Sequence, residues 1–392
     1  MNIINIKPKT RKKGFVDDNF KFSVNQNQVS EDILLKLNFV IKNIEKLNLS
    51  NKSKSIIKKI FNSYQKVRNN EKLDTDDMVL RNHEILEFKK LADKNLARYL
   101  IYRYRYNIYP KLNIIDEYPP CIQIEPTSVC NFRCVMCYQA DKTFSSKSNN
   151  FMGNMKVDLF KKSIDEIEGN IEGVTFASRG EPTLNQNISE MIKYADGKFL
   201  GLKINTNASM LNEKLIHELL SSDIQTIVFS IDAKDKETYE KIRVNGKFEK
   251  TLKNLELFNE IREKNYNRED KIVRISGVKI NDKQNIDEMK KKWGNIADIV
   301  AFTNYTPWES SYDNEVNDID IACKELWTRM FIWWDGKANP CDYDYKSYLS
   351  KWNVANTKIT TIWNSSAYND IRQKHLSNQR NQIEPCKRCI ST

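Results

Sequence analysis

Apolar residues at helical spacing dominate the first 120 positions of the chain. The pattern occurs in three stretches, at residues 30–44, 56–67 and about 78–106, and predicts three helices. Residues 1–29 are polar, and we expect them to be loose or draped on the surface. The segment Tyr118-Pro119-Pro120 marks the end of this helical prefix.

After residue 120, short β-branched runs alternate with helical patterns. The candidate strands are Cys121–Glu125, Gly173–Ser178, Gly201–Asn207, Thr226–Asp232, Ile272–Ile280 and Asp298–Tyr305. The candidate helices lie near 157–168, 187–196, 212–222, 248–263 and 284–293. Such an alternation predicts an α/β fold with a parallel sheet and right-handed crossovers. A site is then expected at the carboxyl ends of the strands.

The alternation stops near residue 320. Residues 331–334 have a strand pattern, Asp335-Gly336 is a hairpin turn signal, and residues 337–341 return from it. A helix is predicted at Ser366–Leu376. We therefore expect a basic helical N-terminal region at 1–118, an α/β domain at 119–315 and a small domain at 316–392.

The amino-acid composition adds a distinguishing feature only for the helical N-terminal region. Hydrophobic residues make up 40% and charged residues 29%, which is typical of a folded soluble chain. No stretch approaches the roughly 20 apolar residues of a membrane span, and no signal peptide is visible, so we expect a cytoplasmic protein. Residues 1–115 hold 24 Lys and Arg against 12 Asp and Glu, and therefore carry the whole net charge of +11. This excess reflects either general Lys-rich composition or a surface for an anionic partner.

Eight cysteines in such a chain indicate metal ligands rather than disulfides. Cys130, Cys134 and Cys137 form a C-x3-C-x2-C segment directly after the first candidate strand. Three thiolates are one short of a closed four-ligand site and leave a metal position open for another ligand. Spacing alone also allows a zinc site or chance proximity.

Further segments resolve this ambiguity. Tyr138 follows the last of these cysteines, Ser178-Arg179-Gly180-Glu181-Pro182 follows the second strand, and Asn205-Thr206-Asn207 and Ser230-Ile231-Asp232 end the next two. In this order and placement the segments resemble the radical S-adenosylmethionine (SAM) superfamily. The resemblance covers about residues 120–392 and implies a partial (β/α)6 TIM-like barrel.

The resemblance also implies cofactors and roles. The three cysteines would hold a [4Fe-4S] cluster whose fourth iron binds SAM, and one electron would cleave SAM to a 5′-deoxyadenosyl radical that abstracts hydrogen from the substrate. Gly180 and Glu181 would contact the methionyl amine, Asn207 the ribose, and Ser230 and Arg243 the carboxylate. Arg179 stands where the family usually has glycine, and we expect it to place an extra cation near the cofactor or substrate.

The other cysteines include Cys323 and Cys341, which bracket the hairpin, and the C-x2-C pair Cys386 and Cys389. Four thiolates suit zinc or a [4Fe-4S] cluster, so ligand count cannot separate the two. The layout resembles the twitch domain, a short form of the SPASM domain, and is similar to that of a radical SAM dehydrogenase that oxidises an aminocyclitol. This resemblance favours an auxiliary [4Fe-4S] cluster. Cys121 is left over and is interpreted as a buried structural thiol.

A fully ligated cluster can accept the electron that a substrate radical loses, and a base must then take a proton. Asp342 follows Cys341 directly and matches an acidic residue that takes the proton in related sulfatase-maturing enzymes. Asp344 is the rival candidate, and either aspartate could instead be an ordinary loop residue.

The leading hypothesis is oxidation of a small hydroxylated molecule, sugar-like or cyclitol-like, with flavodoxin or ferredoxin as the one-electron donor. A peptide maturase is an alternative, although the prefix does not resemble the strand-containing peptide-recognition domain of many such enzymes. Binding of RNA or a membrane surface through the basic prefix, and electron transfer without SAM chemistry, are further alternatives. Substrate contacts are expected near the ends of the last strands, at Lys279, Asn304, Tyr305 and Trp308.

Overall fold

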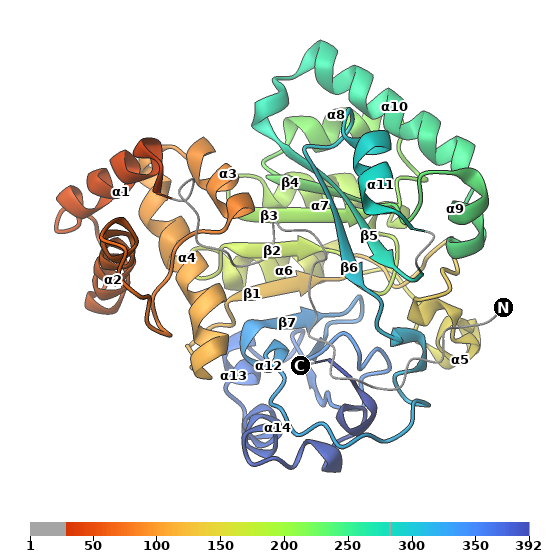
Figure 1. Cartoon of the computed structure of the whole chain (residues 1–392). Coiled ribbons are helices and arrows are strands. Elements are labelled where there is room, and N and C mark those ends of the chain that lie inside the picture. The colour runs from red at the N-terminus through yellow and green to blue at the C-terminus, as the bar shows by residue number, and fades with distance from the viewer. Residues whose placement is uncertain (1–28, 282–283, 392) are drawn as a thin grey trace.

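The computed structural model describes residues 29–281 and 284–391, and the predicted alternation of strands and helices is confirmed in it (Figure 1). The strands are β1 (Cys121–Ile124), β2 (Gly173–Phe176), β3 (Gly201–Thr206), β4 (Thr226–Ser230), β5 (Ile272–Lys279) and β6 (Ile299–Asn304). The helices after them are α5 (Lys142–Ser145), α6 (Val157–Ile167), α7 (Ile188–Ala195), α8 (Glu213–Ser221), α9 (Lys236–Ile242), α10 (Phe248–Asn265) and α11 (Ile286–Trp293). The six strands pair in parallel with their neighbours in the order β6-β5-β4-β3-β2-β1.

Side chains alternate between the two faces of this sheet. Leu202 and Ile204 of β3, like Val273 and Ile275 of β5, belong to the core that packs against the covering helices. The residues between them face the opposite side, where one cavity is lined by residues of β1 through β7. A cavity touched by that many neighbouring strands requires a curved sheet, so the domain is a partial barrel that does not close, as expected.

The helical prefix covers the amino ends of the strands (Figure 1). Its helices are α1 (Glu31–Asn43), α2 (Asn51–Arg68), α3 (Asn82–Lys90) and α4 (Asp93–Leu112). Arg98 of α4 joins the barrel through two hydrogen bonds to Glu172, at 2.7 and 3.0 Å. The expected tail at residues 1–29 lies outside the described residues apart from residue 29.

The prediction of one helix from 78 to 106 is wrong, because the segment forms two helices. Glu84 accepts a hydrogen bond from the backbone nitrogen of Arg81 at 2.8 Å and so caps a helix that begins at Asn82. Leu91 and Ala92 then adopt extended backbone angles between α3 and α4. Apolar spacing continued through this break and concealed it.

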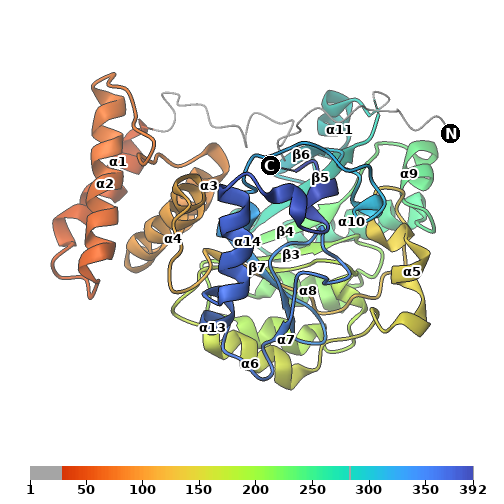
Figure 2. The same ribbon diagram turned by 90° about the horizontal axis from the view of Figure 1, so that it is seen from below.

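The C-terminal region extends the barrel sheet rather than standing apart from it. Strand β7 (Arg329–Ile332) pairs in parallel with β1, and β8 (Lys337–Asn339) and β9 (Trp352–Asn353) follow as antiparallel neighbours. Gly336 has a φ of +85°, as the predicted hairpin turn requires. Helices α12 (Glu325–Thr328), α13 (Ile359–Trp363) and α14 (Ser366–Leu376) complete the region, and Figure 2 shows α13 and α14 beside the strands.

Candidate active site

The loop after β1 brings Cys130, Cys134 and Cys137 together with a small apolar cluster that includes Phe132 and Ile242. Each sulfur accepts a hydrogen bond. The backbone nitrogens of Phe132 and Gln139 donate to Cys130 and Cys137 at 3.4 and 3.5 Å. A guanidinium nitrogen of Arg243 lies 3.9 Å from the sulfur of Cys134. Donors aimed at sulfur stabilise thiolates and fit a cluster-binding loop.

Burial raises the pKa of all three thiols, and for Cys134 the charge of Arg243 opposes this effect. Buried thiolates without a cation are therefore unfavourable here, and a positively charged metal group would compensate them.

Gly180 packs directly against the segment that leads into this loop. A Cβ atom on Gly180 would lie 2.2 Å from the carbonyl oxygen of Thr127 and 2.6 Å from that of Val129. The next residue, Glu181, donates its backbone N–H to the Val129 carbonyl at 2.9 Å. Only glycine allows this close approach, which places the Gly180-Glu181 motif beside the cysteine loop.

The Glu181 carboxylate is buried and joins two strand ends. It accepts hydrogen bonds from the Thr206 hydroxyl and the Asn207 backbone nitrogen, both at 2.6 Å. The Asn207 side chain donates to Asn131, the neighbour of Cys130, at 3.0 Å. Burial raises the pKa of Glu181, and these hydrogen bonds oppose the rise.

Arg243 and Ser230 lie on the neighbouring part of the barrel. Arg243 forms a 2.6 Å ion pair with Asp232, two residues beyond the end of β4. Ser230 is the last residue of β4 and is partly buried. The structure thus brings Gly180, Glu181, Asn207 and Arg243 to the cysteine loop, and Ser230 lies at the adjacent strand end.

Arg179 has close partners of its own in the structure. Its guanidinium pairs with both carboxylate oxygens of Glu125, at 2.6 and 2.7 Å, and donates to the carbonyl of Tyr345 at 2.7 Å. The ring of Trp333 lies 4.1 Å from the guanidinium carbon. Arg179 therefore ties β1 to the C-terminal region, and its charge is neutralised by a buried carboxylate.

The four C-terminal cysteines also gather in one place. Burial raises the pKa of the Cys341 thiol, and the charges of Asp342, Cys323, Cys389 and Cys386 raise it further, which shows that these groups are neighbours. The buried Arg380, which the motif analysis missed, donates to the carbonyls of Ile321, Cys386 and Cys389 at 3.1, 3.2 and 2.6 Å. This arginine fastens the segments that carry three of the four cysteines.

The spacing of the sulfurs bears on the choice between zinc and iron. Four thiolates at about 2.3 Å from one zinc ion stand only about 4 Å apart. Within residues 29–281 and 284–391, only Asp74, Asp76 and Asp77 bring three ligand atoms within 4.8 Å of one another. By this criterion no three cysteine sulfurs of the described residues stand as close together as the ligands of one bound zinc ion.

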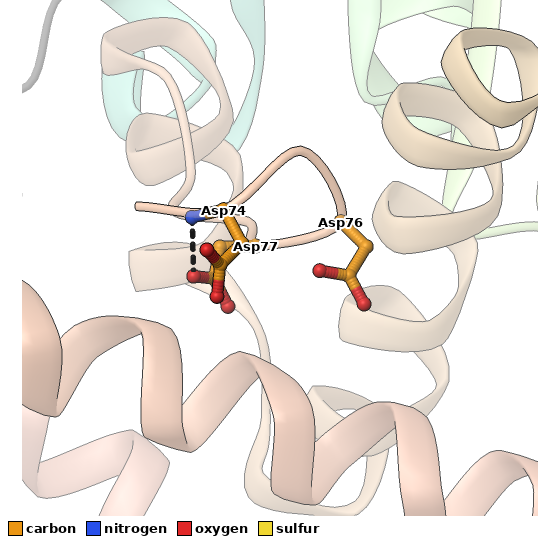
Figure 3. A group of neighbouring side chains, drawn as sticks. All are labelled: Asp74, Asp76 and Asp77. Atoms are coloured by element: carbon orange, nitrogen blue, oxygen red, sulfur yellow. Dashed lines mark hydrogen bonds between the residues drawn. The ribbon is translucent and has the colours of Figure 1, made fainter. Parts of the chain in front are cut away.

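Asp74, Asp76 and Asp77 lie together in the helical prefix (Figure 3). Asp77 accepts hydrogen bonds from Ser63 at 2.9 Å, from the backbone nitrogen of Asp74 at 2.8 Å, and from Lys66 at 2.7 Å. Lys59 pairs with Asp76 at 2.9 Å. Because lysines already neutralise these carboxylates, we assign them a structural role.

The two candidate bases differ in their surroundings. Asp344 is fully buried and accepts from the Tyr312 hydroxyl and two backbone nitrogens at 2.8–2.9 Å, which marks it as a structural group. Burial raises its pKa to about 6 against these hydrogen bonds. Asp342 is partly buried. Its charge helps to raise the pKa of Tyr138, the neighbour of Cys137, and that of Arg329 in β7. Asp342 thus lies near Tyr138 of the cysteine loop and directly after Cys341 in the chain.

A cavity of about 640 Å³, within the range of small-molecule sites, lies on the concave side of the barrel and extends to the amino ends of the strands, since the first residue of each strand from β1 to β7 lines it. The prefix contributes Glu87 and Arg103 to its lining, and Ala322 and Lys324, on either side of Cys323, reach it from the C-terminal region. Cys121 is buried as expected and lines the cavity. The predicted substrate contacts do not line it, although Thr303, directly before Asn304, does.

Polar side chains of the barrel strands face this cavity, and motif analysis missed all of them except Asn205, which belongs to the Asn205-Thr206-Asn207 segment. They are Gln123, Thr175, Lys203, Asn205 and Arg274. The available signal was a lysine and an arginine at alternating positions of otherwise apolar strands.

Comparisons with known proteins agree with this geometry. Residues 124–291 match the model of the radical SAM superfamily, and residues 323–390 match that of the SPASM iron–sulfur cluster-binding domain. These two domains imply a [4Fe-4S] cluster that binds SAM, together with an auxiliary cluster.

Curated relatives are similar over part of their length. The AdoMet-dependent heme synthase of Methanosarcina barkeri is 30% identical over 140 residues, which are 36% of this chain and 39% of that protein. The mycofactocin maturase MftC of Mycolicibacterium smegmatis is 28% identical over 156 residues, 38% of each chain. The chain thus spans about two fifths of the length of these relatives.

Among solved structures, Streptococcus suis SuiB bound to its precursor peptide SuiA is similar to the chain with a TM-score of 0.54 at 17% identity. The match covers 90% of this chain and 85% of that one, and shows a shared fold. None of the described helices is long and apolar enough to cross a membrane.

Proposed function

We propose that this chain, which is a radical SAM enzyme with a C-terminal SPASM domain, oxidises a small hydroxylated molecule held inside its partial barrel. The observation that carries the proposal is the cavity on the concave face of the sheet. It is lined by polar strand residues and is bordered by the segments around Cys323. A substrate in it would lie inside the sheet, beside the segment that carries Cys323.

The residues fit the two clusters. Cys130, Cys134 and Cys137 would hold the cluster that binds SAM, with Gly180, Glu181, Asn207, Ser230 and Arg243 around the SAM molecule. Cys323, Cys341, Cys386 and Cys389 would hold the auxiliary [4Fe-4S] cluster. When bound, these groups supply the radical that abstracts hydrogen and a nearby electron acceptor.

The protein must supply a base, because oxidation of an alcohol carbon removes a proton as well as an electron. Asp342 has the right surroundings for this role. It is next to Cys341 and acts electrostatically on Arg329, which lines the cavity. Asp344 is less suited because its oxygens already accept three hydrogen bonds.

The test is anaerobic incubation of the reconstituted protein with SAM, a reductant and candidate hydroxylated substrates. Oxidation should remove two hydrogens, read by mass, with one 5′-deoxyadenosine formed per product. Asp342→Asn should still cleave SAM but should lose most of the product, by about 10²–10⁴-fold. Asp335→Asn, in the nearby hairpin turn, is the matched control and should behave like the parental protein. Product formation by Asp342→Asn at the parental rate would move the base elsewhere, and rearrangement without net oxidation would remove the electron-acceptor role.

A peptide maturase is the second candidate. It is supported by the extent of the similarity to SuiB, which was solved with a precursor peptide, and by the similarity to a mycofactocin maturase. Against it, the prefix is helical throughout residues 29–112 apart from its connecting loops. The same assay with peptides in place of sugars and cyclitols separates the two functions.

Binding of RNA or a membrane surface by the prefix gains no support from the described part of the chain. Lys52, Lys54, Lys59, Lys66 and Lys89 each form an ion pair with an acidic side chain. Binding that falls steeply with salt would nevertheless favour this function.

A further inference from the structure

Four tyrosine rings form a continuous chain from the cysteine loop to the protein surface. Tyr138 follows Cys137 directly, and its ring centroid lies 5.2 Å from that of Tyr345. The ring of Tyr312 lies 4.9 Å from that of Tyr345 and 4.8 Å from that of Tyr348. The first two rings are buried, whereas Tyr348 at the other end is 61% exposed. The chain of rings thus begins beside a ligand of the first cluster and ends in solvent.

We propose that this chain carries an oxidising equivalent from the cysteine loop to Tyr348, and so removes radicals that would otherwise damage the cluster site. The oxidant is a hydroxyl radical, which forms when peroxide meets ferrous iron held by the loop. The inference depends on the iron of that loop and not on the substrate proposed above.

The chemistry of phenols sets the direction of transfer. A phenol gives up an electron far more readily than it accepts one, so the tyrosines cannot pass electrons inward from a reductant as reduced intermediates. They can supply electrons to an oxidant at the loop, and the electron vacancy then moves outward. The centroid distances of 4.8–5.2 Å lie within the contact range of paired aromatic rings, so each transfer covers only one ring contact.

The two central tyrosines each have a base for the proton that oxidation releases. An oxidised phenol is a strong acid and must pass its proton to a hydrogen-bonded partner. The hydroxyl of Tyr345 donates to Asp141 at 2.8 Å, and that of Tyr312 donates to Asp344 at 2.8 Å. Lys346 lies over both rings, 5.0 Å from the centroid of Tyr312 and 5.5 Å from that of Tyr345. This cation disfavours a ring that keeps a positive charge, so loss of the proton must accompany loss of the electron.

The first transfer begins at the loop. The hydroxyl radical gains one electron and, with a proton from water, becomes water. Tyr138 donates its hydroxyl to the carbonyl of Ser178 at 2.7 Å, and a carbonyl is too weak a base to take the proton. Tyr138 is therefore a bridge between the loop and Tyr345. The electron comes from Tyr345, whose proton passes to Asp141.

The electrons and protons balance in the later transfers as well. Tyr312 gives an electron to Tyr345, which takes its proton back from Asp141. The proton of Tyr312 moves to Asp344 within the hydrogen bond that already joins them. Tyr348 then gives an electron to Tyr312, which recovers its proton from Asp344. Tyr348 releases its own proton to solvent and retains the radical.

The experiment locates radicals on the protein by mass. The reconstituted protein is treated with hydrogen peroxide in the presence of a nitroso spin trap, and peptides that carry a trapped tyrosyl radical are quantified. Tyr194, partly buried on the outer helix α7, gauges radicals that react from solution. We expect more adduct at Tyr348 than at Tyr194. Replacing Cys130, Cys134 and Cys137 together by alanine removes the loop iron and should lower this ratio of adducts at least fivefold.

The variants assign the transfer to individual rings. Tyr345→Phe and Tyr312→Phe keep the ring and remove only the hydroxyl, and each should lower the ratio at least fivefold. Tyr104→Phe is the matched control, because it removes from α4 a buried hydroxyl that donates to the carbonyl of Asp76 at 3.1 Å. It should change the ratio less than twofold. The iron content of each sample shows whether the variant has folded and kept its clusters, and two variants cover the case in which one of them has not.

The inference is overturned if a phenylalanine variant that keeps its iron lowers the ratio less than fivefold. The same result in the alanine variant would overturn it too, since Tyr348 would then react only because it is exposed. An equal yield of adduct at Tyr348 and Tyr194 in the parental protein would also contradict it.

Discussion

Replacing Arg179 by methionine tests whether this arginine is a structural tie or a cofactor contact. Arg179 is 3% exposed and Glu125 is 0% exposed, and their ion pair has two close contacts at 2.6 and 2.7 Å. Methionine keeps an unbranched side chain but removes the charge. Glu125 would then stay buried with two backbone donors, from residues 179 and 334, at 3.0 and 3.2 Å.

Removing one partner of such a buried pair costs about 3–5 kcal/mol, because the other charge stays buried without compensation. Arg98→Met is the matched control, since Arg98 also binds a glutamate through two nitrogens but is 42% exposed. An exposed pair of this kind contributes about 1 kcal/mol or less. The two arginine substitutions should therefore differ by at least about 2 kcal/mol in the free energy of unfolding.

The assay is urea unfolding of the protein without clusters, so that loss of iron does not enter the result. Adding Glu125→Gln to Arg179→Met should recover part of this loss, because a neutral amide no longer needs the cation, although its single oxygen can accept from only one of the two backbone nitrogens. If Arg179→Met destabilises no more than Arg98→Met, and instead weakens SAM binding in a fully stable protein, the structural interpretation is wrong.

The remaining predictions concern the metal and SAM sites. Anaerobic reconstitution should give about eight irons per chain, and replacing Cys130, Cys134 and Cys137 together by alanine should halve this number; zinc without iron in the C-terminal site would contradict the two-cluster assignment. Gly180→Ala should displace the cysteine loop and sharply reduce the iron content, because its Cβ would lie 2.2 Å from a backbone oxygen. Gly169→Ala is the control, since no atom lies within 4 Å of its Cβ position; it should cost only about 1–2 kcal/mol of backbone strain and keep the iron. Arg243→Ala should weaken SAM binding by about 1.5–3 kcal/mol in equilibrium titrations, and unchanged affinity in a folded variant would leave Arg243 a structural partner of Asp232.

The sequence was sufficient wherever a local pattern determines the structure. Each strand from β1 to β6 lies within the range predicted from its β-branched run, and α14 has the predicted bounds, Ser366–Leu376. The cysteine loop and the Gly180-Glu181 motif could be placed together because parallel strands end at one edge of a sheet. The break between α3 and α4 could not be predicted, because it depends on a capping hydrogen bond that leaves the apolar spacing unchanged.

Side-chain partners that lie far apart in the chain could not be predicted from the sequence, for a different physical reason. The charge of Arg179 could be counted, but its pairing with Glu125, 54 positions away, depends on how β1 lies beside β2. The same holds for Arg380, whose three carbonyl partners come from two separate segments. Lys203 and Arg274 have the spacing of ordinary half-exposed strands, and only the curvature of the sheet turns their face into a cavity wall.

The prefix makes this polar interior possible. Strands with inward-facing cations cannot enclose a cavity unless part of the charge is compensated, because like charges in a poorly solvated space repel. Glu87 of α3 partly compensates it, since its charge opposes the lowering of the pKa of Lys203, while Arg103 of α4 keeps that carboxylate in place. The helices of the prefix thus close the cavity at the amino ends of the strands and place both acidic and basic side chains in its wall.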